Sequence, residues 1–273
     1  MIRFGTAGIP LSCNGNTSDG IKCCADMGLK AMEIEFVRSV YLKKQPAIEA
    51  GETAKKYNIK LSAHAPYFIN ACSPEKIKID KSLGYILTSA RALSYAGGGV
   101  VVFHPGYYMG KPTQLCTEQV IDLMQRIYNK IDSSIVLGPE LMGKATQFGS
   151  LEEIVMLAQH FGLKRCCPVV DWGHLNSRTN GSLKSKNAYS KILEYVENNL
   201  GSGAFKNFHS HFSEQEYTEK GERKHIPMGS GEPKFQPLIE LFVENGYSGT
   251  FICESPLLEK DALKMKEMYE KLI

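Results

Sequence analysis

The sequence lacks the features that mark membrane proteins, zinc knuckles and P-loop enzymes. No apolar run approaches the roughly 20 residues that cross a bilayer. It has no C-x-x-C pair, and no glycine-rich phosphate loop follows a strand-like run. The 32 basic and 29 acidic residues leave a formal charge of only +3, which permits a polyanionic partner without arguing for one. These absences exclude several function classes and leave a globular enzyme or binding protein.

The eight cysteines do not form the pattern of a secreted disulfide scaffold. No secretory leader precedes the first strand-like run, at residues 2–5. Cys23-Cys24 and Cys166-Cys167 are adjacent pairs, and neighbouring cysteines seldom reach the Cα separation that a disulfide needs. We therefore expect buried, reduced thiols in a cytoplasmic protein.

Short β-rich runs alternate with amphipathic stretches along the whole chain. The predicted strands are 2–6, 31–36, 60–64, 99–104, 134–140, 167–171, 205–211 and 248–254. The predicted helices are 18–27, 47–57, 80–96, 116–131, 151–161, 187–198, 235–245 and 260–272. Eight βα units in 273 residues predict a single (β/α)8 barrel domain over 1–273, with an open doubly wound sheet as the alternative.

Most of the strand-like runs end in a histidine or a carboxylate, and a further histidine follows one of them. These residues are His64, His104, Glu140, Asp171 with His174, His209 and Glu254. A barrel places its catalytic residues at the carboxyl ends of its strands. Nitrogen and oxygen ligands of this kind suit zinc or manganese, so the pattern predicts a metal centre in the mouth of the barrel.

Each residue also has a less specific interpretation. A lone His64 or His104 could be an ordinary core histidine. Glu140, Asp171 and Glu254 end apolar runs, where an unpaired charge would be costly. The alternative for these carboxylates is a structural ion pair, for instance with an arginine.

The remaining histidines are less clear. His209 and His211 point to the same face if their strand is regular, and at most one of them need be a ligand. His225 lies in a glycine-rich loop, where a solvated histidine is the usual interpretation. His160 falls within the predicted helix 151–161, and we assign it to packing or to the surface.

Taken together, these residues resemble the endonuclease IV family of apurinic/apyrimidinic endonucleases, whose members are (β/α)8 barrels with a trinuclear zinc cluster. The resemblance spans nearly the whole chain and keeps the order and spacing of the motifs. The matching segments are 64–70, 103–106, Glu140 with Gly143, 171–174, His209, His225 with 229–231, and Glu254.

The resemblance implies a role for each matched residue. Glu140 would be the catalytic-site carboxylate that bridges two metals, with His64 and His104 on one side. Asp171, His209 and Glu254 would complete that pair, and His174 and His225 would belong to the third metal. These roles imply about two to three zinc ions per chain, with manganese as another possibility.

The sequence departs from the family motif at one metal ligand. The family has an aspartate two residues before the histidine matched by His225, and Arg223 stands there. Either Glu222 or His211 substitutes for that aspartate, or the third metal is bound weakly or not at all.

Two further residues match the family's contacts with DNA. Tyr67 lies three residues after His64, and Arg38 lies in the loop that follows the second predicted strand. The resemblance implies that both enter the duplex at the lesion, although an ordinary basic surface loop is the alternative for Arg38. The implied reaction is hydrolysis of the phosphodiester 5′ to an abasic site in duplex DNA, and we expect a monomer that does not bind membranes.

The rival interpretation is a one-metal sugar isomerase or epimerase of the xylose isomerase-like superfamily. Glu140, Asp171, His209 and Glu254 also match the minimal ligand set of those enzymes. A one-metal isomerase has no need of the other four histidines together, so the count favours the nuclease. A metal-free binding barrel would require all these ligand types to be accidental.

Overall fold

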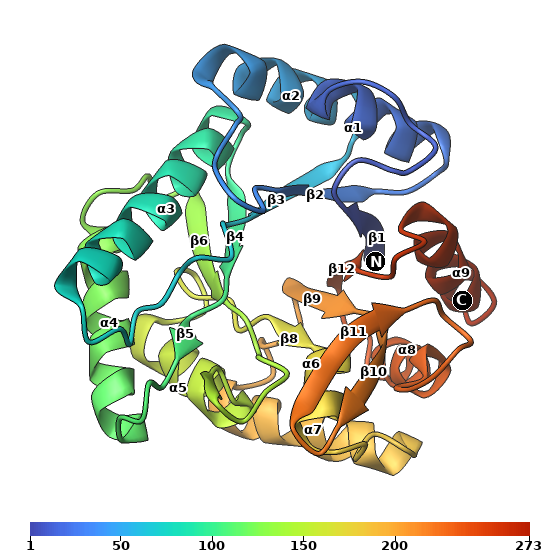
Figure 1. Ribbon diagram of the computed structural model, residues 1–273. Coiled ribbons are helices and arrows are strands. Elements are labelled where there is room, and N and C mark those ends of the chain that lie inside the picture. Colours follow the sequence, from blue (N-terminus) through green and yellow to red (C-terminus); the bar gives the residue numbers. More distant parts are fainter.

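The computed structural model describes residues 1–273, and its eight parallel strands curl into a ring (Figure 1). In spatial order the strands are β6 (Ile135–Pro139), β4 (Gly99–Phe103), β3 (Lys60–His64), β2 (Ala31–Glu35), β1 (Ile2–Ala7), β12 (Gly249–Cys253), β9 (Phe208–Phe212) and β8 (Val170–Asp171). Parallel bridges join Leu137 to Cys166 and Glu140 to Val169, so β6 meets the segment leading into β8. The predicted (β/α)8 barrel is therefore confirmed, and the open doubly wound sheet is wrong.

A helix follows each strand of the ring and covers its outer side (Figure 1). These helices are α1 (Thr17–Asp26), α2 (Lys44–Tyr57), α3 (Lys76–Tyr95), α4 (Thr113–Tyr128), α5 (Leu151–Phe161), α7 (Lys186–Leu200), α8 (Phe235–Glu244) and α9 (Glu259–Glu270). Helix α5 has the predicted bounds, because a capping box of Ser150 and Glu153 fixes its start. No helix is long and apolar enough to span a bilayer.

Several helices begin earlier than predicted, and α2 and α3 show why. Helix α2 starts at Lys44 rather than at residue 47, and α3 starts at Lys76 rather than at residue 80. The residues at their N-caps, Lys43 and Glu75, make no side-chain cap hydrogen bond. The usual sequence signal for a helix start is therefore absent at both places.

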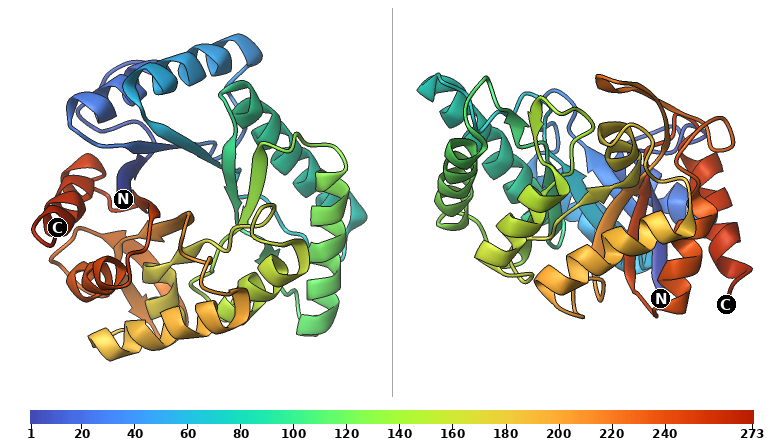
Figure 2. Two further views of the ribbon diagram at one scale, coloured as in Figure 1. Left: turned by 180° about the vertical axis from the view of Figure 1, so that it is seen from behind. Right: turned by 90° about the horizontal axis from the view of Figure 1, so that it is seen from below.

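Several short elements near the mouth of the barrel were not predicted. Helix α6 (Trp172–Arg178) follows β8 directly, with the Asp171 side chain accepting from the backbone N–H of His174. An antiparallel hairpin, β10 (Glu214–Thr218) and β11 (Gly221–Ile226), follows β9, and β5 (Gly106–Tyr107) pairs with β7 (Gln147–Phe148). Seen from the side, the hairpin lies at the end of the barrel opposite the two termini (Figure 2, right).

The expectation that all cysteines are reduced is wrong for one pair. Cys13, in the loop after β1, forms a disulfide with Cys23 of α1, with the two Cα atoms 6.3 Å apart. That separation lies within the range that disulfides adopt. Only adjacent pairs were considered from the sequence, and the turn that brings Cys13 back onto α1 has no signature at that level. The other six cysteines are free and buried, as expected.

The strands carry different chemistry on their two faces. Along β9, Phe208 and Phe212 pack outward against Phe242 and Phe235 of α8, with ring centroids 4.9 and 4.8 Å apart. His209, on the other face of β9, contacts a carboxylate inside the barrel. Outward residues thus form the core between sheet and helices, while inward residues near the carboxyl ends form the site described next.

Candidate metal centre

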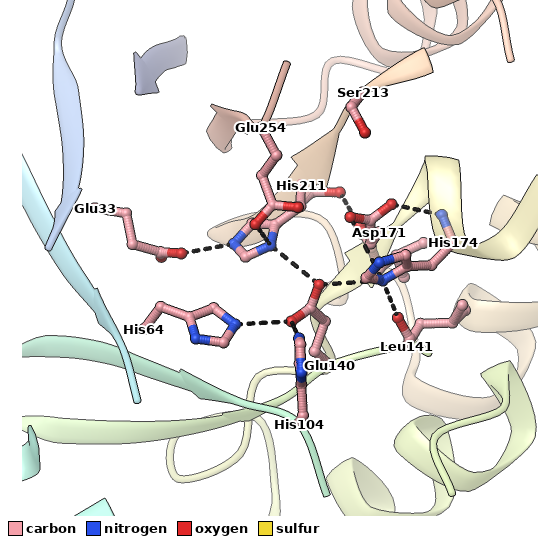
Figure 3. Close-up of polar contacts among 12 residues, drawn as sticks. Glu33, His64, His104, Glu140, Leu141, Asp171, His174, His211, Ser213 and Glu254 are labelled. Carbon is pink, nitrogen blue, oxygen red and sulfur yellow. Dashed lines mark hydrogen bonds and ion pairs between the residues drawn. The ribbon is translucent and has the colours of Figure 1, made fainter. Parts of the chain in front are cut away.

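Histidines and carboxylates from strand ends and loops around the whole ring converge in the mouth of the barrel (Figure 3). Most of them are buried, and their ligand atoms form four groups, three of which share residues; within each group all atoms lie within 4.8 Å of one another. The groups contain Glu33, His64, His104, Glu140, Asp171, His174, His209, His211, Glu222, His225 and Glu254. Every metal ligand expected from the sequence is in one of these groups, but not always with the expected neighbours.

The first group consists of His64, His104 and Glu140. His64 Nε2 lies 3.1 Å and His104 Nε2 lies 3.0 Å from the same oxygen, Glu140 Oε2. His64 ends β3, and the backbone carbonyl of Ala65 lies 2.8 Å from its Nδ1. The Nδ1 proton is therefore directed to that carbonyl, and Nε2 is left free to bind a cation on the Glu140 side.

The second group shares Glu140 and adds Asp171, His211 and Glu254. His211 Nδ1 lies 3.2 Å from Glu140 Oε1 and 3.1 Å from Glu254 Oε1. Because Glu140 presents one oxygen to each group, it lies between them in Figure 3. A carboxylate placed in this way would be able to hold one cation on each of its oxygens.

His211 occupies the position in this group that the sequence comparison gave to His209. Both histidines of β9 do point inward, as its regular alternation predicts. His209, however, lies one layer deeper, where its Nε2 is 2.8 Å from Glu33 Oε2. The structure does not bring His209 into contact with Glu140, Asp171 or Glu254.

The third group consists of His174, Glu222 and His225. Glu222 lies between the two imidazoles, with its oxygens 3.4 Å from His174 Nε2 and 3.6 Å from His225 Nε2. The hairpin thus brings Glu222 to the place where Arg223 interrupts the family motif, and Arg223 instead pairs with the exposed Glu216. A Cβ at Gly143 would lie 2.8 Å from Glu222 Cβ, so glycine there leaves room for this approach.

The carboxylates of the centre have no arginine or lysine partner. All ion pairs of Glu140, Asp171, Glu222 and Glu254 are with histidines. The arginine partner considered from the sequence is therefore absent, and histidines are the ion-pair partners instead. Asp171 Oδ2 is buried and has no hydrogen-bond partner, which is costly unless a cation is bound there.

The donor set fits divalent cations such as zinc. Imidazole nitrogens and carboxylate oxygens are its preferred ligands, and each of the three groups around Glu140 offers at least three of them at one point. The orphaned Asp171 oxygen belongs to a residue of the second group. We therefore regard these groups as able to hold metal ions, without assigning their identity or number.

Burial and neighbouring charges shift the pKa values of the side chains in the centre. Burial disfavours the ionised form of Glu140, but the nearby His104 and His211 outweigh burial and hold its pKa well below the usual value. Burial likewise opposes the charged form of His64, yet the hydrogen bond with Glu140 and the charge of Glu35 raise its pKa to about 10. Burial raises the pKa of Asp171 to about 7. Without metal, the carboxylates are thus balanced by protons.

An open cleft of about 350 Å³ leads to the centre, lined by His104, His174, Glu222 and Tyr67 among others. The Tyr67 ring stacks on His104 with centroids 5.4 Å apart, and the residue is 49% exposed. The Tyr67 backbone N–H donates to the carbonyl of Val37, which ties its loop to the loop of Arg38. Arg38 is exposed.

Large apolar side chains are exposed around the same mouth. Six of them lie on β5 or on the loops that follow β2, β3 and β5: Val37, Tyr41, Tyr67, Phe68, Tyr107 and Met109. Exposed apolar residues gathered in one place mark an interaction surface more often than residues scattered singly. The mouth therefore combines a metal-binding floor with an apolar, partly aromatic rim.

Sequence reasoning missed or left open three residues of the centre. Glu33 is in the middle of β2 rather than at its end, so the strand-end criterion did not select it. Glu222 was left as one of two alternatives because the hairpin was not predicted. His211 could have been preferred over His209, because it is the last residue of the predicted strand 205–211 and the later residue lies nearer the mouth.

Comparisons with known proteins agree with the fold, and the similar proteins fall into two functional classes. The family model described as xylose isomerase-like TIM barrel matches residues 21–272. An uncharacterized protein of Methanocaldococcus jannaschii is 36% identical over 275 residues, covering 100% of this chain and 98% of the relative. A probable endonuclease 4 of Clostridium botulinum is 25% identical over 236 residues, covering 81% of this chain and 83% of the relative.

Solved structures of both functional kinds have the same fold. A D-tagatose 3-epimerase-like protein aligns with a TM-score of 0.76 and 21% identity, covering 99% of this chain and 96% of that one. Endonuclease IV from Thermus thermophilus aligns with a TM-score of 0.74 and 16% identity, covering 99% of this chain and 98% of that one. These alignments establish the architecture and do not discriminate between the two functions.

Proposed function

The chain belongs to the xylose isomerase-like TIM barrel family, and we propose that within this family it is a metal-dependent endonuclease that hydrolyses the phosphodiester 5′ to abasic sites in duplex DNA. The sequence resemblance to the endonuclease IV family and the 25% identity to a probable endonuclease 4 support this direction. Identity at this level does not by itself establish a reaction, so the case depends on the residues of the site.

The observation that carries the proposal is the presence of three ligand groups around Glu140. The second group alone provides Glu140, Asp171, His211 and Glu254, which is enough for one cation. The first and third groups add four further histidines and Glu222 on either side of it. A centre with several cations suits an in-line displacement at phosphorus, in which both the attacking and the leaving oxygen need charge stabilisation.

Zinc, with about two to three ions per chain, is the metal we propose, and manganese is the alternative. When bound, such ions would polarise the phosphoryl group and lower the pKa of a water nucleophile. His64, His104 and Glu140 would hold the first ion, Glu140, Asp171, His211 and Glu254 the second, and His174, Glu222 and His225 the third. Glu140 would keep the first two ions at a fixed separation.

The rim residues would bind the DNA. Tyr67 projects from the wall of the cleft beside His104, and an aromatic ring there can stack in the space that a missing base leaves. The exposed Arg38 lies on the loop tied to Tyr67 by the Val37 backbone contact, and its guanidinium is suited to a phosphate. Burial of the carboxylates beneath this rim would keep bulk water from screening the metal charges.

A one-metal sugar isomerase or epimerase is the second candidate function. The likeness to the D-tagatose 3-epimerase-like structure, with a TM-score of 0.76, and the completeness of the four-residue second group favour it. In that case the first and third groups would have no catalytic role. The two candidates therefore differ in whether the histidines outside the second group are needed.

The direct test incubates the purified protein with a labelled duplex that carries one abasic site, with and without chelator, and measures the metal content of the same sample. Chelator-sensitive nicking 5′ to the lesion, with more than one ion per chain, is expected. A single ion with no nicking, together with metal-dependent conversion of a ketose followed by NMR, would favour the isomerase.

Variants of the first group make the distinction sharper. His104→Asn removes a ligand of the first group and leaves the second group intact. The nuclease proposal predicts loss of nicking and of one metal ion, whereas an isomerase would keep its activity. His160→Asn is the matched control, because His160 is an exposed residue of α5 outside every ligand group.

A further inference from the structure

A buried carboxylate on β2 lies directly beneath the second ligand group. Glu33 is fully buried, and its two oxygens contact different residues. Oε2 accepts from the Ser62 hydroxyl at 2.7 Å and lies 2.8 Å from His209 Nε2. Oε1 lies 2.9 Å from His211 Nε2, but the geometry is not that of a hydrogen bond, so both buried atoms lack a hydrogen-bond partner. Figure 3 shows Glu33 on the opposite side of the His211 ring from Glu140.

The His211 ring therefore has a carboxylate at each of its nitrogens. Its Nδ1 faces Glu140 at 3.2 Å and Glu254 at 3.1 Å, while its Nε2 faces Glu33. A neutral imidazole carries one N–H and one lone pair, and a metal ligand must direct its lone pair at the metal. A carboxylate behind the ring selects the tautomer with the proton on Nε2 and leaves the Nδ1 lone pair toward the second group.

We propose that Glu33 is the positioning residue for His211. It orients the imidazole, holds the proton on Nε2 and makes Nδ1 a stronger ligand, as carboxylate partners do for histidines that bind zinc. His209 and Ser62 act one step further back by holding Glu33 in place. The proposal rests on the metal-binding function proposed above, but not on the identity of the substrate.

Glu33, His209 and His211 could instead be a cation site of their own. Ligands of a tetrahedral zinc lie about 2.0 to 2.1 Å from the metal, which places them about 3.3 Å from one another. The Glu33 contacts of 2.8 and 2.9 Å are the shortest between a carboxylate and a histidine in the four groups, and the first of them is a direct hydrogen bond. Ser62 also occupies Oε2, so positioning is the interpretation we adopt.

The position of His209 is also explained. His209 lies too deep to reach the second group, yet it is buried with its ring nitrogen on Glu33. Its donated proton, with that of Ser62, stabilises the ionised carboxylate that His211 needs. In this proposal the two histidines of β9 have different roles. His211 is the metal ligand, and His209 holds the carboxylate that lies behind the His211 ring.

The experiment measures zinc affinity ion by ion, by competition with a chromogenic chelator, in wild-type protein and in Glu33→Ala and Glu33→Gln. Loss of a carboxylate that orients a ligand weakens metal binding by about 10- to 100-fold. We expect that loss for one ion in Glu33→Ala, a smaller loss in Glu33→Gln because an amide oxygen can still accept from Nε2, and no change for the other ions. The proposal would be overturned if each ion bound the two variants with the same affinity as the wild-type protein.

Glu35→Gln is the matched control on the same strand. Glu35 points into the barrel two residues from Glu33, but no hydrogen bond or ion pair joins it to His211. Burial raises its pKa to about 8, so an amide resembles the neutral form it holds at neutral pH. Its substitution is expected to leave the affinity of the second group unchanged.

A spectroscopic readout separates positioning from general loss of structure. In ¹⁵N-histidine-labelled, zinc-loaded protein, two-bond ¹H–¹⁵N spectra report the tautomer of each ring, and the His211 signals are those missing in His211→Asn. The expected wild-type pattern is protonated Nε2 with metal on Nδ1, and the reverse tautomer would overturn the proposal. Wild-type protein that binds no metal at all would instead reject the proposed metal-dependent function itself.

Discussion

The inner and outer faces of the barrel strands differ sharply, although the same strands carry both. On β9, outward Phe208 and Phe212 pack against α8, while inward His209 and His211 contact Glu33 and Glu140. The outer face buries apolar area, which stabilises the fold. The inner face buries charges that must be paired, which contributes little or opposes folding.

This difference separates stability from function within single strands. Because side chains alternate with a period of two, a slip of one residue would exchange the two faces completely. The outer aromatic packing therefore fixes the register of the strands, and this register directs the inner ligands toward one point. It follows that substitutions on the two faces should have separable effects, and the predictions below test that separation.

The largest effect is expected from Glu140→Gln, which alters only the inner face. The amide cannot bridge two cations, so metal should be lost from the first two groups. Cleavage of abasic duplex should fall by about 10³- to 10⁴-fold, since metal stabilisation of charge is worth several kcal/mol. Single-turnover rates and metal analysis measure both quantities. A variant that retains full metal content and rate would show that Glu140 is not the bridge.

Phe242→Ala tests the outer face. Its ring contacts Phe208, Phe251 and Trp172, and removal of such a ring costs about 3 to 5 kcal/mol in the free energy of unfolding. Denaturant titration measures the loss. Metal content and affinity of the folded variant should stay at the wild-type level, and Phe242→Leu should recover most of the stability. Equal loss of metal affinity would contradict the separation of the faces.

The sequence was sufficient for the fold and for much of the site, for one physical reason. In a barrel, the end of each strand has a known location, so a residue such as Glu140 or Glu254 could be placed without coordinates. The same reasoning did not rank His209 and His211, because both share the inner face and the choice depends on how deep in the barrel the other ligands lie.

The residues that escaped prediction depend on contacts between distant segments. Glu33 acquires its role only because β2 and β9 face each other across the barrel, through the contact to His211. Glu222 reaches His174 only because the hairpin folds over Gly143. The alternation of side chains along β2 could have predicted that Glu33 points inward. It could not have predicted which residue Glu33 contacts.

Removal of the Cys13–Cys23 disulfide is expected to have a smaller effect than either substitution above. The bond closes a loop with a sequence separation of 10 residues outside both strand faces, which limits its stabilisation to about 2.8 kcal/mol. The double variant Cys13→Ser/Cys23→Ser should lose no more than this in denaturant titration and keep its metal. Mass spectrometry of alkylated protein verifies the bond in the wild type, and lost metal affinity would show that the β1–α1 loop supports the centre.

The prediction most specific to the inner face is the pH dependence of stability. In metal-free protein burial opposes the charged form of His64, but its hydrogen bond to Glu140 and the nearby carboxylates raise its pKa to about 10. The stability that this proton contributes is present below the unfolded pKa of about 6.5 and is lost as pH rises toward 10. Burial raises the pKa of Glu35 to about 8, so this carboxyl also makes stability fall as pH rises, from its unfolded pKa of about 4.3 up to about 8.

Metal-free protein should therefore lose stability between about pH 6.5 and 10, with a slope on the order of 1.4 kcal/mol per pH unit for each linked proton. With zinc bound, the histidines are unprotonated in the folded state, so protons compete with the metal and stability should rise with pH up to about 7. Thermal unfolding at several pH values, with zinc or with chelator, measures the two slopes. Phe242→Ala should lower both curves without changing either slope, because the aromatic packing that it removes carries no titrating group. If stability changed with pH in the same way with zinc and with chelator, bound metal would not alter the protonation of the inner residues, and the prediction would be wrong.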